Sequence, residues 1–162
     1  MAGIIDEKTV NQVVLPAGHP QATRDHVAEL HEKQPHLLDF LWTMYHKVQP
    51  EVGELMIFIC LAVYRMFRTA TGASIPMAGP DDLARSVSDN NDRVQSLDSA
   101  TRASLLAANP DLKARQPHVL GFVVDSLCET STEEDPVPLR EDEKAFLFLT
   151  AATVCDVLDR MG

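Results

Sequence analysis

The 162-residue sequence is poor in the residues on which disulfide-bonded and zinc-binding domains depend. It has three cysteines, Cys60, Cys128 and Cys155, and no Cys-x-x-Cys pair. An odd count without that spacing argues against both a disulfide framework and a zinc site. Each cysteine lies in an apolar, helix-like context, where a free thiol behaves as a small hydrophobic group. We therefore expect a reducing, cytoplasmic setting and no cofactor.

Positive charge is also scarce. The 14 lysines and arginines are outnumbered by 24 acidic residues, which gives a net charge of −10. A chain of this charge repels phosphate backbones, so the sequence predicts no nucleic-acid partner. It disfavours anionic membrane surfaces for the same reason. The longest apolar run, residues 55–64, is far shorter than the roughly 20 residues of a membrane span.

Motifs for catalysis are absent from the sequence. It contains no glycine-rich phosphate loop, no nucleophile elbow and no Ser-x-x-Lys element. It also lacks the Glu-x-x-His pairs of a di-metal helical bundle. His31 and His36 resemble a zinc-protease signature, but they are five positions apart and Pro35 separates them. These absences favour a protein that is not an enzyme.

An internal repeat is the clearest positive feature of the chain. Residues 29–41 (ELHEKQPHLLDFL) and 111–123 (DLKARQPHVLGFV) share six identical positions of thirteen at a constant offset. A second echo lies upstream of each copy, as Ala-Thr-Arg at 22–24 and at 100–102. Repetition of this kind indicates a fold built by copying one small unit.

Helical periodicity and proline punctuation predict an all-α fold. Scarce glycine and abundant Ala, Leu and Glu favour helix. Apolar residues recur at helical spacing after Pro35 and after Pro117, and residues 51–71 and 141–161 are the most apolar segments. We expect a bundle of about six or more helices, in which two duplicated helical repeats surround two central apolar helices.

The same punctuation suggests how the chain is organised. We expect one domain over residues 1–162, with an N-terminal arm without helical period at 1–19, repeat A at 20–72, a connector at 73–80, a linking helix at 81–97 and repeat B at 99–162. Residues 129–138 form an acidic, proline-interrupted loop. The linking helix carries a thin heptad seam, formed by Leu83, Val87, Asn90, Val94 and Leu97.

The repeated Gln-Pro-His element supplies the candidate site residues, which are Gln34, His36, Gln116 and His118. Duplication could bring the two histidines together, so that two imidazoles and two amides bind a metal or a polar ligand. In the favoured interpretation the element is structural, because proline begins the helix and its neighbours cap or lock the turn. We therefore assign no catalytic, cofactor-binding or metal-binding residue.

Two functional hypotheses follow. The first is a non-enzymatic protein–protein interaction or adaptor module, a homodimer that associates through the arm 1–19 and the helix 81–97. It depends on the unplaced apolar arm and on the heptad seam. The alternative is a small-ligand-binding or metal-binding protein, or an enzyme, with a polar site between the repeats that uses His36 and His118.

Overall fold

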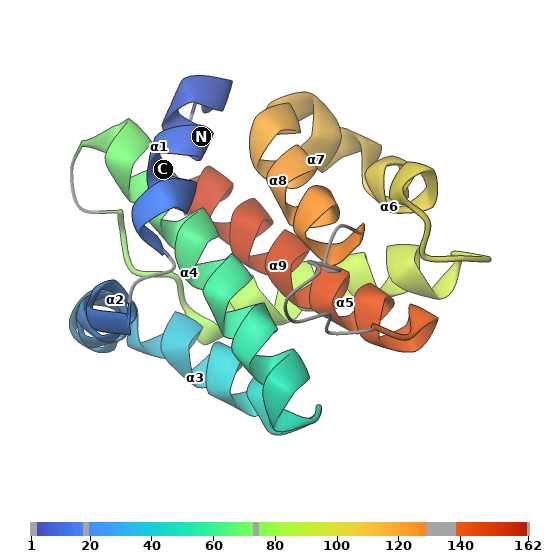
Figure 1. Ribbon diagram of the computed structural model, residues 1–162, viewed down its shortest axis with the longest axis horizontal. Coiled ribbons are helices and arrows are strands. Elements are labelled where there is room, and N and C mark those ends of the chain that lie inside the picture. The colour runs from blue at the N-terminus through green and yellow to red at the C-terminus, as the bar shows by residue number, and fades with distance from the viewer. Residues whose placement is uncertain (1–2, 18–19, 73–74, 129–138, 162) are drawn as a thin grey trace.

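The computed structural model describes residues 3–17, 20–72, 75–128 and 139–161, and within them it shows nine helices and no strand. The predicted all-α bundle of six or more helices is therefore confirmed (Figure 1). The helices are α1 (Glu7–Ala17), α2 (Pro20–Lys33), α3 (Pro35–Tyr45), α4 (Pro50–Thr71), α5 (Pro80–Gln95), α6 (Arg102–Ala108), α7 (Pro110–Arg115), α8 (Pro117–Cys128) and α9 (Glu141–Met161).

Proline begins six of these helices, namely α2, α3, α4, α5, α7 and α8. The fixed φ of proline suits the first helical turn, where its missing N–H costs no hydrogen bond. Helix α4 ends at Gly72, whose φ of +63° is the left-handed conformation that glycine adopts readily. The helices predicted after Pro35 and Pro117 begin at those residues, and the predicted apolar helix at 51–71 lies within α4.

The expectation that residues 1–19 lack helix is wrong, because α1 occupies Glu7–Ala17. Asp6 begins this helix by accepting a hydrogen bond from the backbone N–H of Thr9 at 2.8 Å. Ile5, Val10 and Val13 are buried in the core of the same chain. The apolar residues of this segment are thus largely used inside the protein.

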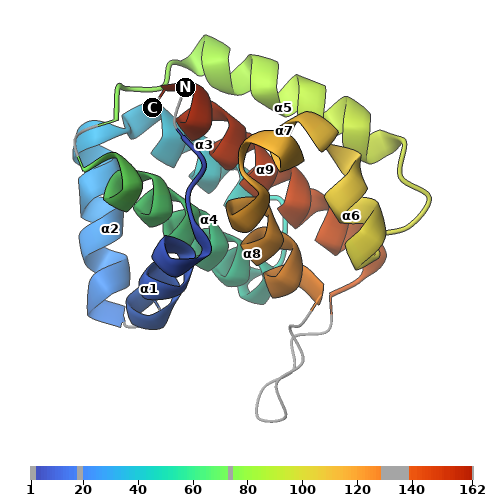
Figure 2. The same ribbon diagram turned by 90° about the horizontal axis from the view of Figure 1, so that it is seen from above.

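Helix α5 confirms the helix predicted at 81–97, although it begins one residue earlier and ends at Gln95. It runs along one edge of the molecule and contacts α9 and α3 (Figure 2). Leu83 and Asn90 of the heptad seam are buried there. The seam therefore packs within the chain. The acidic loop at 129–138 lies outside the described residues.

Helices α4 and α9 lie side by side. Helix α4 also contacts α1, α2, α3 and α8, and α9 also contacts α3, α5 and α8. Every residue of α9 from 147 to 159 is buried, so the protein encloses this stretch on all sides. Within the described ranges, no helix is long and apolar enough to cross a membrane.

Candidate functional site

Gln34 holds the segment that leads into α5. It caps the start of α3 and is only 1% exposed. Its side-chain Nε2 donates to the carbonyl oxygens of Ile75 at 3.1 Å and Pro76 at 3.0 Å, and its Oε1 accepts from the N–H of Ala78 at 3.0 Å. A buried amide that forms three such bonds fixes residues 75–78 on the body of the protein.

Gln116 does the same for the segment that leads into α1. It is fully buried before α8, and its Nε2 donates to the carbonyl oxygen of Gly3 at 2.8 Å. Its Oε1 accepts from the N–H of Ile5 at 3.0 Å. Nε2 also donates to the carboxylate of Asp159 at 2.8 Å. The helix that follows each held segment contacts a helix that begins with a Gln-Pro-His element, since α1 contacts α8 and α5 contacts α3.

The two glutamines share their local geometry. Their φ and ψ angles are −136° and 60° at Gln34, and −138° and 66° at Gln116. The backbone N–H of each donates to a buried leucine four residues earlier, at 2.7 Å to Leu30 and 2.8 Å to Leu112. Both side chains therefore hold backbone segments that are distant in the sequence, and the side chain of Gln34 makes no capping hydrogen bond to α3.

The two histidines lie against different segments. His36 is half-buried on α3 and faces α5, whereas His118 is exposed and acts electrostatically on Asp6 at the start of α1. Among the described residues, no hydrogen bond joins His36 to His118. Over the same residues, no cluster of three His, Cys, Asp or Glu side chains could hold a metal ion.

A groove between α3 and α5 has a volume of about 370 Å³. We call it the α3–α5 groove. Its floor is the buried Leu83, and Phe40 and Val87 line it half-buried. The remaining lining residues are His36, Asp39, Thr43, Pro80 and Ala84. The groove is open and mostly apolar, which is typical of a surface that receives another helix.

Two large apolar side chains project from the segments that the glutamines hold. Ile4 is 62% exposed and Met77 is 53% exposed. Ile4 lies between the two residues that Gln116 bonds, and Met77 lies between Pro76 and Ala78. A single exposed apolar residue is ordinary, but two in matched positions on fixed backbone form a repeated surface feature.

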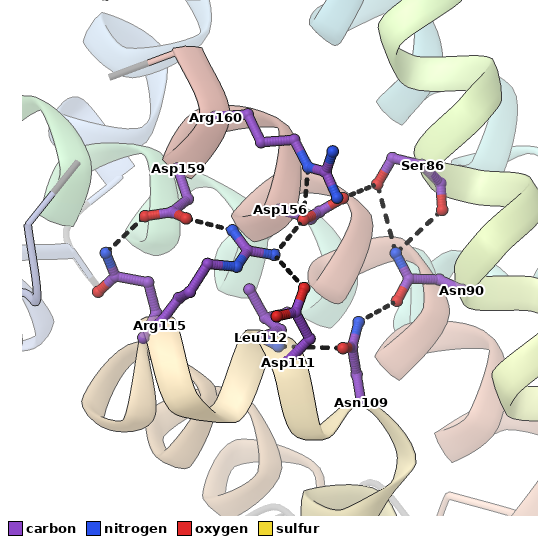
Figure 3. Close-up of polar contacts among 10 residues, drawn as sticks. Ser86, Asn90, Asn109, Asp111, Leu112, Arg115, Asp156, Asp159 and Arg160 are labelled. Carbon is purple, nitrogen blue, oxygen red and sulfur yellow. Dashed lines mark hydrogen bonds and ion pairs between the residues drawn. The ribbon is translucent and has the colours of Figure 1, made fainter. Parts of the chain in front are cut away.

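A buried ionic cluster that the sequence did not predict lies at the end of α9 (Figure 3). Asp156 and Asp159 are 4% and 0% exposed, and Arg115 of α7 reaches both. Its Nη2 donates to Asp156 at 2.6 Å, and its Nη1 donates to Asp159. The pair of aspartates three positions apart in an otherwise apolar helix was the available signal, because such charges are buried only with a partner.

The cluster continues into α5 and α7. The hydroxyl of Ser86 donates to Asp156 at 2.8 Å, and the amide of Asn90 donates to the backbone carbonyl of Ser86 at 3.0 Å. Asn109 then donates to Asn90 at 2.9 Å. The hollow beside Asp156 measures about 30 Å³, which is room for one or two water molecules. The cluster therefore joins α5, α7 and α9.

The ionised form of Asp156 is favoured in this cluster. Burial raises the pKa of its carboxyl group, but hydrogen bonds from Arg115, Ser86 and Arg160 outweigh burial and lower the pKa below its ordinary value. A carboxylate held this way is satisfied by its neighbours. It joins α5, α7 and α9 through these hydrogen bonds.

No protein-family model, curated protein or solved structure matches this chain. A functional proposal therefore depends on the geometry described above.

Proposed function

We propose that this protein is a non-enzymatic protein–protein interaction module that acts as a homo-oligomer. The observation that carries the proposal is the matched exposure of Ile4 and Met77, each on a backbone segment that a buried glutamine fixes. A second copy of the chain is the partner that covers them.

Fixing these side chains before binding favours association. A flexible segment loses conformational entropy when it binds, whereas a segment already held by hydrogen bonds, three at residues 75–78 and two at residues 3–5, loses little. The side-chain amides of Gln34 and Gln116 form these hydrogen bonds within the chain. Burying an exposed isoleucine or methionine side chain contributes about 1.5–3 kcal/mol. In a two-fold dimer each contact occurs twice.

The matching hydrogen bonds of Gln34 and Gln116 also support an internal duplication. The duplicated unit would be larger than the sequence repeats at 20–72 and 99–162. In this proposal α1–α4 correspond to α5–α9, and α6 and α7 together take the place of α2. The first helix of each unit packs mainly on the last helix of its own unit, since α1 contacts α4 and α5 contacts α9, and it also contacts the other unit, at α8 and α3 respectively. Helices α4 and α9 are then the two central apolar helices.

The alternative function, a metal or small-ligand site that uses His36 and His118, has less support. Both glutamines of that candidate site already bond backbone groups within the chain. Neither amide can bind a ligand without releasing the segment that it holds, which would leave buried polar groups unpaired.

Light scattering coupled to size-exclusion chromatography tests the proposal. We expect the wild-type chain to be a dimer at micromolar concentration. Ile4→Ser and Met77→Ser should each weaken the dimer at least about tenfold, with unchanged melting temperature, because both side chains are exposed. Trp42→Ser is the matched control, since Trp42 is 39% exposed on a different surface segment. A wild-type monomer at about 100 μM would refute self-association.

A further inference from the structure

The α3–α5 groove has the pattern of a helix-binding surface. From α5, the lining residues Pro80, Leu83, Ala84 and Val87 stand at i, i+3, i+4 and i+7. This spacing places them along one face of the helix. The α3 residues that line the groove repeat the spacing, as His36, Asp39, Phe40 and Thr43. Two helix faces thus border one channel along about two helical turns, or roughly 10 Å.

The groove is shallow in a way that suits close approach of another helix. Ala84 is exposed near the middle of the α5 stripe, and its small side chain leaves room above the floor formed by Leu83. Phe40 and Val87 flank that space as half-buried apolar walls. An amphipathic helix that inserts apolar side chains at i, i+3, i+4 and i+7 would complete the burial of these residues.

The negative charge around the groove indicates the charge of the polar face of the bound helix. Asp39 is exposed in the lining, and the lining contains no lysine or arginine. The flanking exposed residues Asp81 and Asp89 of α5 add negative charge, against the single exposed Arg85 in that stretch. With a net charge of −10, the chain attracts cationic segments.

We propose that the α3–α5 groove binds a cationic amphipathic helix of a different protein. The apolar face of that helix would lie on Leu83, Ala84 and Val87, and a lysine or arginine near its edge would pair with Asp39. This inference goes beyond self-association through Ile4 and Met77, because it assigns a second surface and a partner of opposite charge.

Calorimetric titration with designed helical peptides tests the proposal. One peptide of about 16 residues carries leucines at i, i+3, i+4 and i+7 with lysines on the other face, and a second carries glutamates in place of the lysines. We expect the cationic peptide to bind wild-type protein with one site per chain, and the acidic peptide to bind at least tenfold more weakly. Raising the salt concentration should reduce binding of the cationic peptide.

Three variants locate the site. Ala84→Gln fills the groove with a helix-compatible side chain on an exposed position, and it should weaken binding at least tenfold, whereas Ala114→Gln, also exposed on a helix, should not. Asp39→Asn should weaken binding about two- to fivefold, the usual effect of one exposed ion pair. Asp98→Asn, on an exposed carboxylate outside the groove, should leave binding unchanged.

These assays test the two proposed surfaces independently. Ala84→Gln should keep the mass of the wild-type oligomer, and Ile4→Ser should keep the affinity for the cationic peptide. Equal binding of the two peptides would overturn the groove proposal, and so would no binding of either. Wild-type affinity in Ala84→Gln would also overturn it. None of these results bears on dimer formation, which light scattering measures by itself.

Discussion

Replacing Arg115 with methionine should destabilise the fold strongly. The side chain of Arg115 is 17% exposed and supplies the positive charge that reaches both Asp156 and Asp159. After the substitution Asp156 keeps its hydrogen bonds from Ser86 and Arg160, but Asp159, fully buried, keeps only Gln116. Removing one partner of a buried ion pair costs about 3–5 kcal/mol. For a chain of this length that corresponds to a melting temperature lower by about 10 °C.

The difference in stability should depend on pH in a definite direction. Folding lowers the pKa of Asp156, and Arg115 is one cause of that shift. A carboxyl group with a lowered folded-state pKa contributes stability above its unfolded-state pKa of about 3.9, and this contribution is lost as the pH falls through the folded-state value. The gap between wild type and Arg115→Met should therefore be largest near pH 7 and should narrow below about pH 4.

Urea denaturation followed by circular dichroism at 222 nm measures this gap. Arg140→Met is the matched control, because Arg140 is 74% exposed and pairs with the exposed Asp142 at 3.4 Å. A surface pair of this kind contributes about 0–1 kcal/mol. A loss below about 1 kcal/mol in Arg115→Met at pH 7, or a gap that stays constant from pH 7 to pH 3, would refute the assignment of a buried ionic cluster.

Two further sites allow simple tests. Gly53→Ala should lower stability by about 1–3 kcal/mol in thermal denaturation, because a Cβ there would lie 2.5 Å from the ring of Tyr45. Gly121→Ala, where a Cβ meets no atom within 4 Å, should instead raise stability by about 0.5–1 kcal/mol; a loss of stability there would contradict the described helix environment. A thiol reagent at pH 8 should modify the partly exposed Cys128 first. Cys60, whose pKa burial raises, should react only on unfolding, and equal rates by mass spectrometry would contradict this burial.

Much of the fold was predictable because local signals mark helix boundaries. Pro35, Pro50 and Pro117 each begin a helix where the sequence indicates one. Helix α1 was missed because Val10 and Val13 supply a narrow apolar stripe between polar residues, and tertiary contacts with α4 and α8 stabilise it. In a segment this short, the apolar pattern alone does not predict a helix. The prediction also needs the surface against which the segment packs.

The candidate site was predictable only in part. Repetition drew attention to Gln34 and Gln116, but their partners at residues 75–78 and 3–5 are non-helical backbone with no sequence signature. The ionic cluster joins Arg115 to residues more than forty positions away. Pairings at that separation depend on how the helices pack against one another. The periodicity of a single helix does not predict this packing.

The reciprocal fastening by the two glutamines has a consequence for biosynthesis. The amide that holds Ile5 belongs to Gln116, which is translated 111 positions later. Residues 3–5 therefore lack this hydrogen-bond partner during synthesis until Gln116 has emerged from the ribosome. A truncated chain that ends after α5 would lack Gln116, so residues 3–5 would not be held to the body of the protein. Such a chain should be more susceptible to proteolysis at that segment.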